Sequence, residues 1–340
     1  MSANPILGID VLGAPPWRTA DPFLFCVHHD DAYPKGTAQQ GPAASLAGRN
    51  LGNDFTPLDG WRMYHGDVVP GFPRHPHRGF ETVTVVRRGF VDHSDSLGAT
   101  ARYGNGDVQW MTAGRGIVHA EMFPLTRRDQ DNPLELFQIW INLPARSKMV
   151  EPHFTMLWDE SVPEVVFTDD DNRKTAVTLS AGELEGKRPP APAPNSWAAD
   201  PSHEVAIWQI RMDGGARFEV PAASTGVNRT FYVFRGAGID LAGQSISNGR
   251  RVEVRADQPV AIRNGFEPTE ILMLQGRPIG EPVANYGPFV MNTRAELEQA
   301  FADYRRTQFG GWPWRRDDPV HAATERRFAK HPDGHLDKPV

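Results

Sequence analysis

The chain has 340 residues, a formal net charge of -6 at pH 7 and a single cysteine, Cys26. Its length favours two domains, and its acidic balance argues against direct nucleic-acid binding through a basic surface. One cysteine can supply neither an internal disulfide nor a thiolate metal cluster, which is typical of a reducing compartment. The start of the chain lacks a basic segment followed by an apolar one, and no apolar run approaches about eighteen residues. We therefore expect no signal peptide and no membrane contact, and predict a cytoplasmic protein.

Short segments of alternating apolar residues recur along the chain. Glycines and prolines separate them, and the chain contains 32 and 30 of these residues. A period of two is typical of β-strands. We predict strands within residues 82–93, 134–143, 204–212, 229–241, 252–264 and 269–276. So many strands at close spacing indicate an all-β protein built from sandwiches or barrels.

One segment, residues 292–309, is predicted to be a helix. Thr293 and Glu296 have the spacing of a capping box, in which each side chain bonds the other residue's backbone N–H. The apolar stripe of this helix consists of Leu297, Ala300, Phe301 and Tyr304. Gly310 and Gly311 are expected to end it.

A weak internal repeat relates residues 79–91 to residues 228–239 when Gly89 is aligned with Gly236. Each copy reads as a strand, an Arg-Gly turn and a second strand. On this alignment the places of His75 and His77 are taken by Ala222 and Ser224. We therefore expect the second copy to keep the strands and to bind no metal.

Two segments could separate the copies, residues 143–154 and residues 187–202. The second is rich in proline and alanine and cannot form the interior of a sheet. Composition alone favours a boundary there.

Two pairs of metal-ligating residue types have strand spacing. His75 and His77 are separated by one proline, and His119 and Glu121 by one alanine, after a glycine-rich turn. Residues at i and i+2 of a strand project to the same face. Two such pairs on neighbouring strands can hold one divalent metal and leave coordination positions for water or substrate. A lone pair of histidines on a strand is often a surface feature, so the second pair decides in favour of a metal site.

Three other residues are further candidates for metal ligands. Glu81 shares a face with His77 if the strand is regular, so it is either a rival ligand or a buried carboxylate close to the site. His65 and His93 lack a paired ligand at i±2, and we interpret them as loop or surface residues.

The motifs resemble a known family. Residues 75–86 (HPHRGFETVTVV), 107–122 (DVQWMTAGRGIVHAEM) and 276–301 are similar to signature stretches of the pirins, within the cupin superfamily. The resemblance implies a bicupin: two β-barrel (double-stranded β-helix) domains followed by a C-terminal helix. It implies boundaries at residues 1–149, 150–290 and 291–340, with the proline-rich segment as a loop of the second barrel.

The same resemblance implies that the first barrel binds a metal through three histidines and one glutamate. Carried onto this chain, these are His75, His77, His119 and Glu121. Fe(II) is the metal that the family implies, with Mn, Ni, Cu, Co or Zn as alternatives. The second barrel of the family is typically free of metal.

The family implies two different functions. One is quercetin 2,3-dioxygenase activity, with a flavonol-like substrate and dioxygen as partners and with Glu121 as catalytic proton acceptor. The other is that of a metal-dependent, redox-sensitive cofactor of transcription regulators, which needs a protein partner. No basic cluster resembles a nuclear localisation signal, so the enzyme is favoured. Candidates to line the cavity are Val83, Val85, Trp110, Met111, Phe137 and Ile139.

Overall fold

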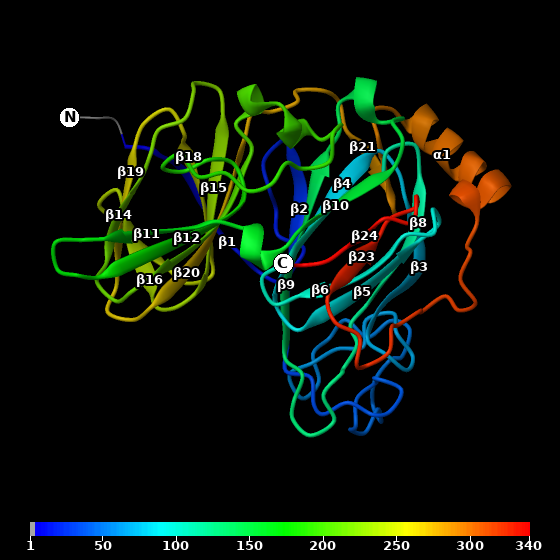
Figure 1. Cartoon of the computed structure of the whole chain (residues 1–340). Helices are drawn as coiled ribbons and strands as arrows, with labels where there is room; N and C mark the ends of the chain where they lie inside the picture. The colour runs from blue at the N-terminus through cyan, green and yellow to red at the C-terminus, as the bar shows by residue number, and fades with distance from the viewer. Residues whose placement is uncertain (1–3) are drawn as a thin grey trace. The chain divides into compact units, whose positions relative to one another are not determined.

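Strands dominate the computed structural model, which describes residues 4–340 (Figure 1). Within this range there is one α-helix, α1 (Arg294–Thr307). Each predicted strand segment contains at least one strand, so the all-β prediction is confirmed. The helices in these residues include none that is both long and apolar enough to cross a bilayer.

The described chain divides into two units, each assembled from separate stretches. Unit 1 comprises residues 4–27, Ile139–Asn142 and Ser161–Gly280. Unit 2 comprises His28–Gln138, Leu143–Glu160 and Glu281–Val340. The domain boundaries taken from the family stay a prediction.

Unit 1 is built on two antiparallel sheets around one apolar core. The larger has the order β1 (Ile6–Val11), β18 (Arg250–Arg255), β15 (Asn228–Arg235), β20 (Thr269–Gly276), β13 (Ala206–Met212), β12 (Lys174–Ala181) and β11 (Glu164–Thr168). The smaller has the order β14 (Arg217–Val220), β19 (Val260–Asn264), β16 (Gly238–Leu241) and β17 (Gln244–Ser247). The proline-rich segment lies between β12 and β13 and contains no strand, as the resemblance implies. Ala222 and Ser224 lie in an exposed loop between β14 and β15.

Unit 2 has two larger sheets with an apolar cluster between them. One has the order β10 (His153–Leu157), β7 (Val108–Thr112), β4 (Phe80–Arg88), β9 (Leu134–Asn142) and β2 (Phe23–Asp31), in which Ile139–Asn142 of β9 and residues 23–27 of β2 are assigned to unit 1. The other has the order β24 (Leu336–Asp337), β23 (Phe328–Lys330), β6 (Thr100–Gly104), β5 (Phe90–Asp95), β8 (Ile117–Met122) and β3 (Gly71–His77). The C-terminal strands thus extend this sheet beside β6 (Figure 1).

The aligned glycines of the repeat occupy the same place in both units. Gly89 follows β4 and Gly236 follows β15, each at a turn into the next strand. Both have a positive φ, 82° and 100°. An added Cβ would approach a backbone carbonyl oxygen to 2.9 Å and 2.6 Å respectively. These turns therefore require glycine, which explains why the repeat is visible in the sequence.

Helix α1 has the predicted cap and the predicted buried stripe. Thr293 Oγ1 accepts from the Glu296 N–H, and the Glu296 carboxylate accepts from the Thr293 N–H. Leu297 and Ala300 are buried, while Phe301 and Tyr304 are partly buried in the same cluster. The cluster also contains Val118, Phe289, Met291 and Phe309, so the helix packs next to β22 (Phe289–Met291). That strand pairs with β21 (Ala284–Tyr286).

Candidate metal centre

Three imidazoles converge at the edge of the six-stranded sheet of unit 2. His75 lies directly opposite His119 in the antiparallel pair β3–β8, and His77 lies opposite Ile117. The ring centroids are 4.4 Å apart for His75 and His119, and 4.8 Å for His77 and either of the others. One potential ligand atom from each ring lies within 4.8 Å of the other two. Pro76 is tolerated because β3 is an edge strand, where a missing N–H leaves no ladder bond unmade.

The hydrogen bonds of two rings determine which ring nitrogen carries the proton. Nδ1 of His75 faces the Pro73 carbonyl oxygen at 2.8 Å, and Nδ1 of His77 faces that of Pro288 at 3.4 Å. A carbonyl can only accept, so each Nδ1 carries the proton and each Nε2 carries a lone pair. Outer bonds of this kind set the tautomer of metal-ligating histidines.

His119 supports a metal more directly. Its ring is fully buried, and neither Nδ1 nor Nε2 has a hydrogen-bond partner among residues 4–340. An unpaired buried polar atom is costly, and a metal ion would satisfy Nε2. The three imidazoles therefore fit a divalent metal.

Burial also keeps these imidazoles neutral. It lowers the pKa of His75 to about 4, and lowers the pKa of His77 and of His119 well below the ordinary value. A neutral imidazole is the form that binds metals.

Glu121 lies on the same strand as His119 but is held by other partners. Its Oε2 is 4.0 Å from His119 Nε2 and accepts a hydrogen bond from Gln138 Nε2 at 2.7 Å. Its Oε1 accepts from Thr84 Oγ1 at 3.2 Å and lies 3.5 Å from the hydroxyl oxygen of Tyr103. Burial raises the pKa of Glu121, against the opposing effects of His93 and these hydrogen bonds. Glu121 is thus a buried carboxylate beside His119, outside the group of three imidazoles whose ligand atoms lie within 4.8 Å of one another.

Of the two alternatives predicted for Glu81, the structure shows the buried carboxylate, and Glu81 is not in the group of ligand atoms formed by the three histidines. His77 ends β3 and Phe80 begins β4, so the two residues are not on one continuous strand. The Glu81 carboxylate accepts from Thr112 Oγ1 at 2.7 Å and from Trp110 Nε1 at 3.3 Å. It faces away from Thr84, which contacts Glu121 from the alternate face of β4.

His93 was predicted to be a loop or surface residue, and this was wrong. It is fully buried on β5, directly opposite Glu121, with its ring centroid 5.6 Å from that of His119. Its Nε2 lies 3.1 Å from an Asp95 carboxylate oxygen. The sequence feature that could have indicated a buried His93 is Asp95, a carboxylate two positions further along the same alternating strand. His65 lies in an exposed turn, as predicted.

The side chains facing the site also differ from the prediction. Gln138 reaches Glu121, so Phe137 and Ile139 lie on the opposite face of β9. Tyr103 OH donates to Gln109 Oε1, so Gln109 lies on the inner face of β7. Met111, two positions along the strand, shares that face. Of the six apolar candidates only Met111 is inward; Val83, Val85, Trp110, Phe137 and Ile139 belong to the other face. Polar side chains, those of Thr84, Tyr103 and Gln138, surround the Glu121 carboxylate in place of most of the predicted apolar ones.

A second group of potential ligands is better explained by ion pairing. His28, Asp30 and Glu135 lie within the same distance criterion of one another. The Glu135 carboxylate, however, pairs with Arg87 and, at 3.0 Å, with Arg88, which also pairs with Asp30. These cations already neutralise the carboxylates, so we assign no metal there.

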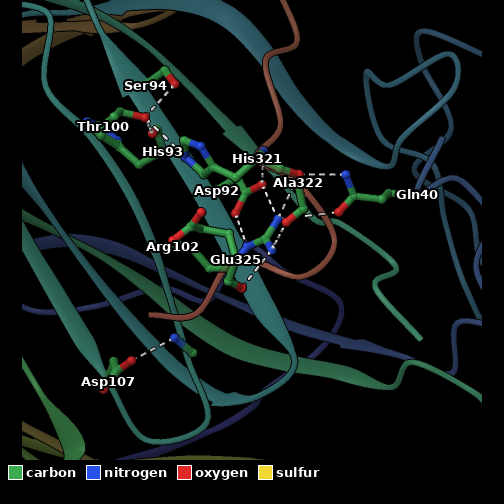
Figure 2. Close-up of polar contacts among 11 residues, drawn as sticks. Gln40, Asp92, His93, Ser94, Thr100, Arg102, Asp107, His321, Ala322 and Glu325 are labelled. Atoms are coloured by element: carbon green, nitrogen blue, oxygen red, sulfur yellow. Dashed lines mark hydrogen bonds and ion pairs between the residues drawn. The ribbon is translucent and has the colours of Figure 1, made fainter. Parts of the chain in front are cut away.

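Arg102 on β6 binds the C-terminal tail to the outer face of the six-stranded sheet that carries the three histidines (Figure 2). Its buried guanidinium donates to both carboxylate oxygens of Asp92 at 2.7 Å. It also donates to the carbonyls of Ala322 at 2.7 Å, Glu325 at 3.1 Å and His321 at 3.2 Å. Asp92 precedes His93 on β5, so these contacts support the strand that carries His93.

Comparison with known proteins agrees with this architecture. A pirin family model matches residues 11–141, and a model of the pirin C-terminal cupin domain matches residues 207–310. The chain belongs to the pirin family. Human pirin is 34% identical over 254 residues, which cover 73% of this chain and 80% of that protein. A Pseudomonas aeruginosa protein named "Putative quercetin 2,3-dioxygenase" is 34% identical over 239 residues, covering 70% of this chain and 79% of that protein.

A solved structure extends the likeness over almost the whole pirin chain. It is a crystal structure of quercetin 2,3-dioxygenase from Acinetobacter baumannii, with a TM-score of 0.70 and 25% identity. The match covers 90% of this chain and 98% of that one. The predicted bicupin fold with a C-terminal helix is therefore confirmed.

The lowered pKa values predict an unusual pH dependence of metal binding. Three ordinary histidines, with pKa near 6.5, would weaken binding by up to roughly three orders of magnitude per pH unit below that value. Here the imidazoles are already neutral at pH 6, and His75 is protonated only near pH 4. We expect a loss of at most about one order of magnitude per pH unit between pH 6.5 and 5, because Glu121 is the only proposed ligand whose pKa is raised by burial. Nickel titrations against a chelator at several pH values measure this; a threefold steeper slope would contradict it.

Proposed function

We propose that this pirin is a metal-dependent dioxygenase of the quercetin 2,3-dioxygenase type, acting on flavonol or other enolic substrates. The metal is held by His75, His77 and His119, with Glu121 as the fourth ligand, and Fe(II) is the ion that the family implies. The observation that carries the proposal is the buried imidazole of His119, which has no hydrogen-bond partner in the described chain, within a cluster of three. The match to a quercetin 2,3-dioxygenase structure supports the reaction class.

A divalent metal in this place supplies a Lewis acid that increases the acidity of a substrate hydroxyl and a redox centre for dioxygen. The protein supplies a base. Glu121 is buried, and burial raises its pKa, so it accepts a proton more readily than an exposed carboxylate does. The hydrogen bonds from Gln138 and Thr84, one to each oxygen, fix the orientation of the carboxylate.

The reaction balances as one flavonol plus one dioxygen giving one depside plus one carbon monoxide. In this scheme Glu121 takes the proton of the flavonol 3-hydroxyl and returns it to the depside carboxylate. The polar inner face, with Tyr103 and Gln109 beside Glu121, offers further partners for substrate oxygens. The protein thus positions the enol next to its base, which is the contribution expected of a preorganised site.

Carbon monoxide release from quercetin under air tests the proposal. We expect release by the iron-loaded protein, abolished when a chelator strips the metal. Glu121→Gln keeps three imidazoles and the shape of the side chain but removes the base and the anionic ligand, so its activity is compared with that of the wild type at equal metal occupancy. It should lower kcat by about 10²-fold or more, the typical contribution of a general base.

A metal-loaded protein that releases no carbon monoxide from several flavonols would instead favour the binding-protein alternative. In that alternative the same metal barrel recognises a protein partner. The cytoplasmic location remains a prediction from the sequence.

A further inference from the structure

A cluster of aromatic rings adjoins the candidate metal centre on the side of His75. Phe72 of β3 lies with its ring centroid 6.2 Å from that of His75. From Phe72 the rings continue to Tyr64 at 5.2 Å, to His65 at 5.8 Å and to Phe55 at 6.3 Å. All of these residues belong to unit 2. A continuous path of rings thus leads from a surface loop to a proposed metal ligand.

Among the three imidazoles, exposure to solvent is greatest on this side. His77 and His119 are buried, whereas His75 keeps part of its surface exposed, as does Phe72. Phe55 is 47% exposed and contacts the exposed ring of His65, with centroids 4.9 Å apart. Single exposed aromatic residues are ordinary, but a connected set of them beside a polar cluster is characteristic of a ligand site.

The support behind these rings is rigid. Tyr64 is buried, and its hydroxyl donates to Asp31 Oδ2 at 2.6 Å. The hydroxyl oxygen of Tyr64 also lies 2.7 Å from His29 Nδ1 and accepts a hydrogen bond from Arg62 Nη1 at 3.1 Å. Tyr64 in turn contacts the rings of both Phe55 and Phe72. The exposed rings therefore rest on a side chain that is held in one orientation, which lowers the entropy lost when a ligand stacks on them.

His65 adds a polar group to this surface. Its Nδ1 faces the Gly52 carbonyl oxygen at 2.6 Å, so Nδ1 carries the proton. In the neutral ring, Nε2 is then an acceptor. A hydroxyl on a stacked ligand could donate to it.

We propose that Phe55, His65 and Phe72 form the wall on which the aromatic ring system of a planar, hydroxylated substrate stacks while its enol reaches the centre beside His75. This inference rests on the proposed function and assigns the substrate-selecting side of the same site. It predicts that a flat aromatic enol is preferred over an aliphatic one. Aromatic faces recognise flat π-systems by offset or edge contacts, and His65 favours one that carries hydroxyl groups.

Anaerobic binding of quercetin to the iron-loaded protein, followed by the quercetin absorption band, tests the wall without turnover. Phe55→Ala should raise Kd about two- to tenfold, the range of one aromatic contact. Phe55→Trp should restore binding. Phe266→Ala is the matched control, because Phe266 is a fully exposed phenylalanine of unit 1. Phe72→Leu, checked for folding by circular dichroism, should weaken binding as Phe55→Ala does.

Kinetics add a second readout. In Phe55→Ala, KM for quercetin should rise by the same factor while kcat changes little, and KM for a small aliphatic enediol should not change. Unchanged quercetin binding in Phe55→Ala overturns the inference, as does a loss that Phe266→Ala shares or a wild-type protein that binds no quercetin. The proposed function is tested by a different outcome. If quercetin binds in a way that depends on Phe55 but no carbon monoxide is released, the proposed reaction is contradicted and the proposed binding surface is not.

Discussion

Replacing His119 with alanine is expected to remove metal from the protein. His119 is the member of the cluster whose two ring nitrogens lack any hydrogen bond in the described chain. Loss of a ligand should lower affinity by more than the roughly 10- to 100-fold that follows loss of an outer-shell partner. Elemental analysis after purification without added metal, together with a chelator competition assay, measures the effect. Full occupancy in His119→Ala would refute the assignment.

Glu81→Gln provides the matched control for this experiment. Glu81 is also buried and acidic, but its carboxylate is bonded to Thr112 and Trp110 on the face away from Glu121. We expect the variant to retain metal, with at most some loss of stability. Loss of metal in Glu81→Gln, with retention in Glu121→Gln, would show that the general cupin pattern applies in place of the pirin one.

Replacing Arg102 with methionine is expected to destabilise the fold by about 3–5 kcal/mol. The substitution leaves the Asp92 carboxylate, which is fully buried, without its cation. It also leaves the carbonyls of Ala322 and Glu325 without the guanidinium that now donates to them. The free energy of unfolding from urea titration measures the effect, and limited proteolysis should show cleavage beyond residue 311.

Arg316→Met is the control for the tail. Arg316 forms a two-bond contact with Asp318 of the kind that Arg102 forms with Asp92, but its side chain is 64% exposed. Solvent screening limits such pairs to about 1 kcal/mol or less. If Arg102→Met costs no more than Arg316→Met, the tail is not held by a buried charge pair.

Most of the secondary structure could be predicted from local sequence patterns. Alternation marked the strands because a strand with one buried face must alternate, and the capping box of α1 was readable because it involves only Thr293 and Glu296. The paired spacing of His75 with His77 was informative for the same reason, since two side chains at i and i+2 share a face whatever surrounds them. Residues separated by two to four positions are constrained by backbone geometry alone.

What the sequence by itself determined, then, is the all-β architecture, the helix and the three histidines as candidate ligands. The tertiary structure decided which faces of the strands meet. The turn at Gly79 separates Glu81 from the face of His77, and the pairing of β5 with β8 places His93 opposite Glu121. It also showed that Arg102 on β6 binds a tail more than 200 residues away, with separations of 219 to 223 positions. Register and long-range pairing depend on the packing of the whole barrel, and a one-residue slip exchanges the two faces of a strand, so no local pattern specifies them.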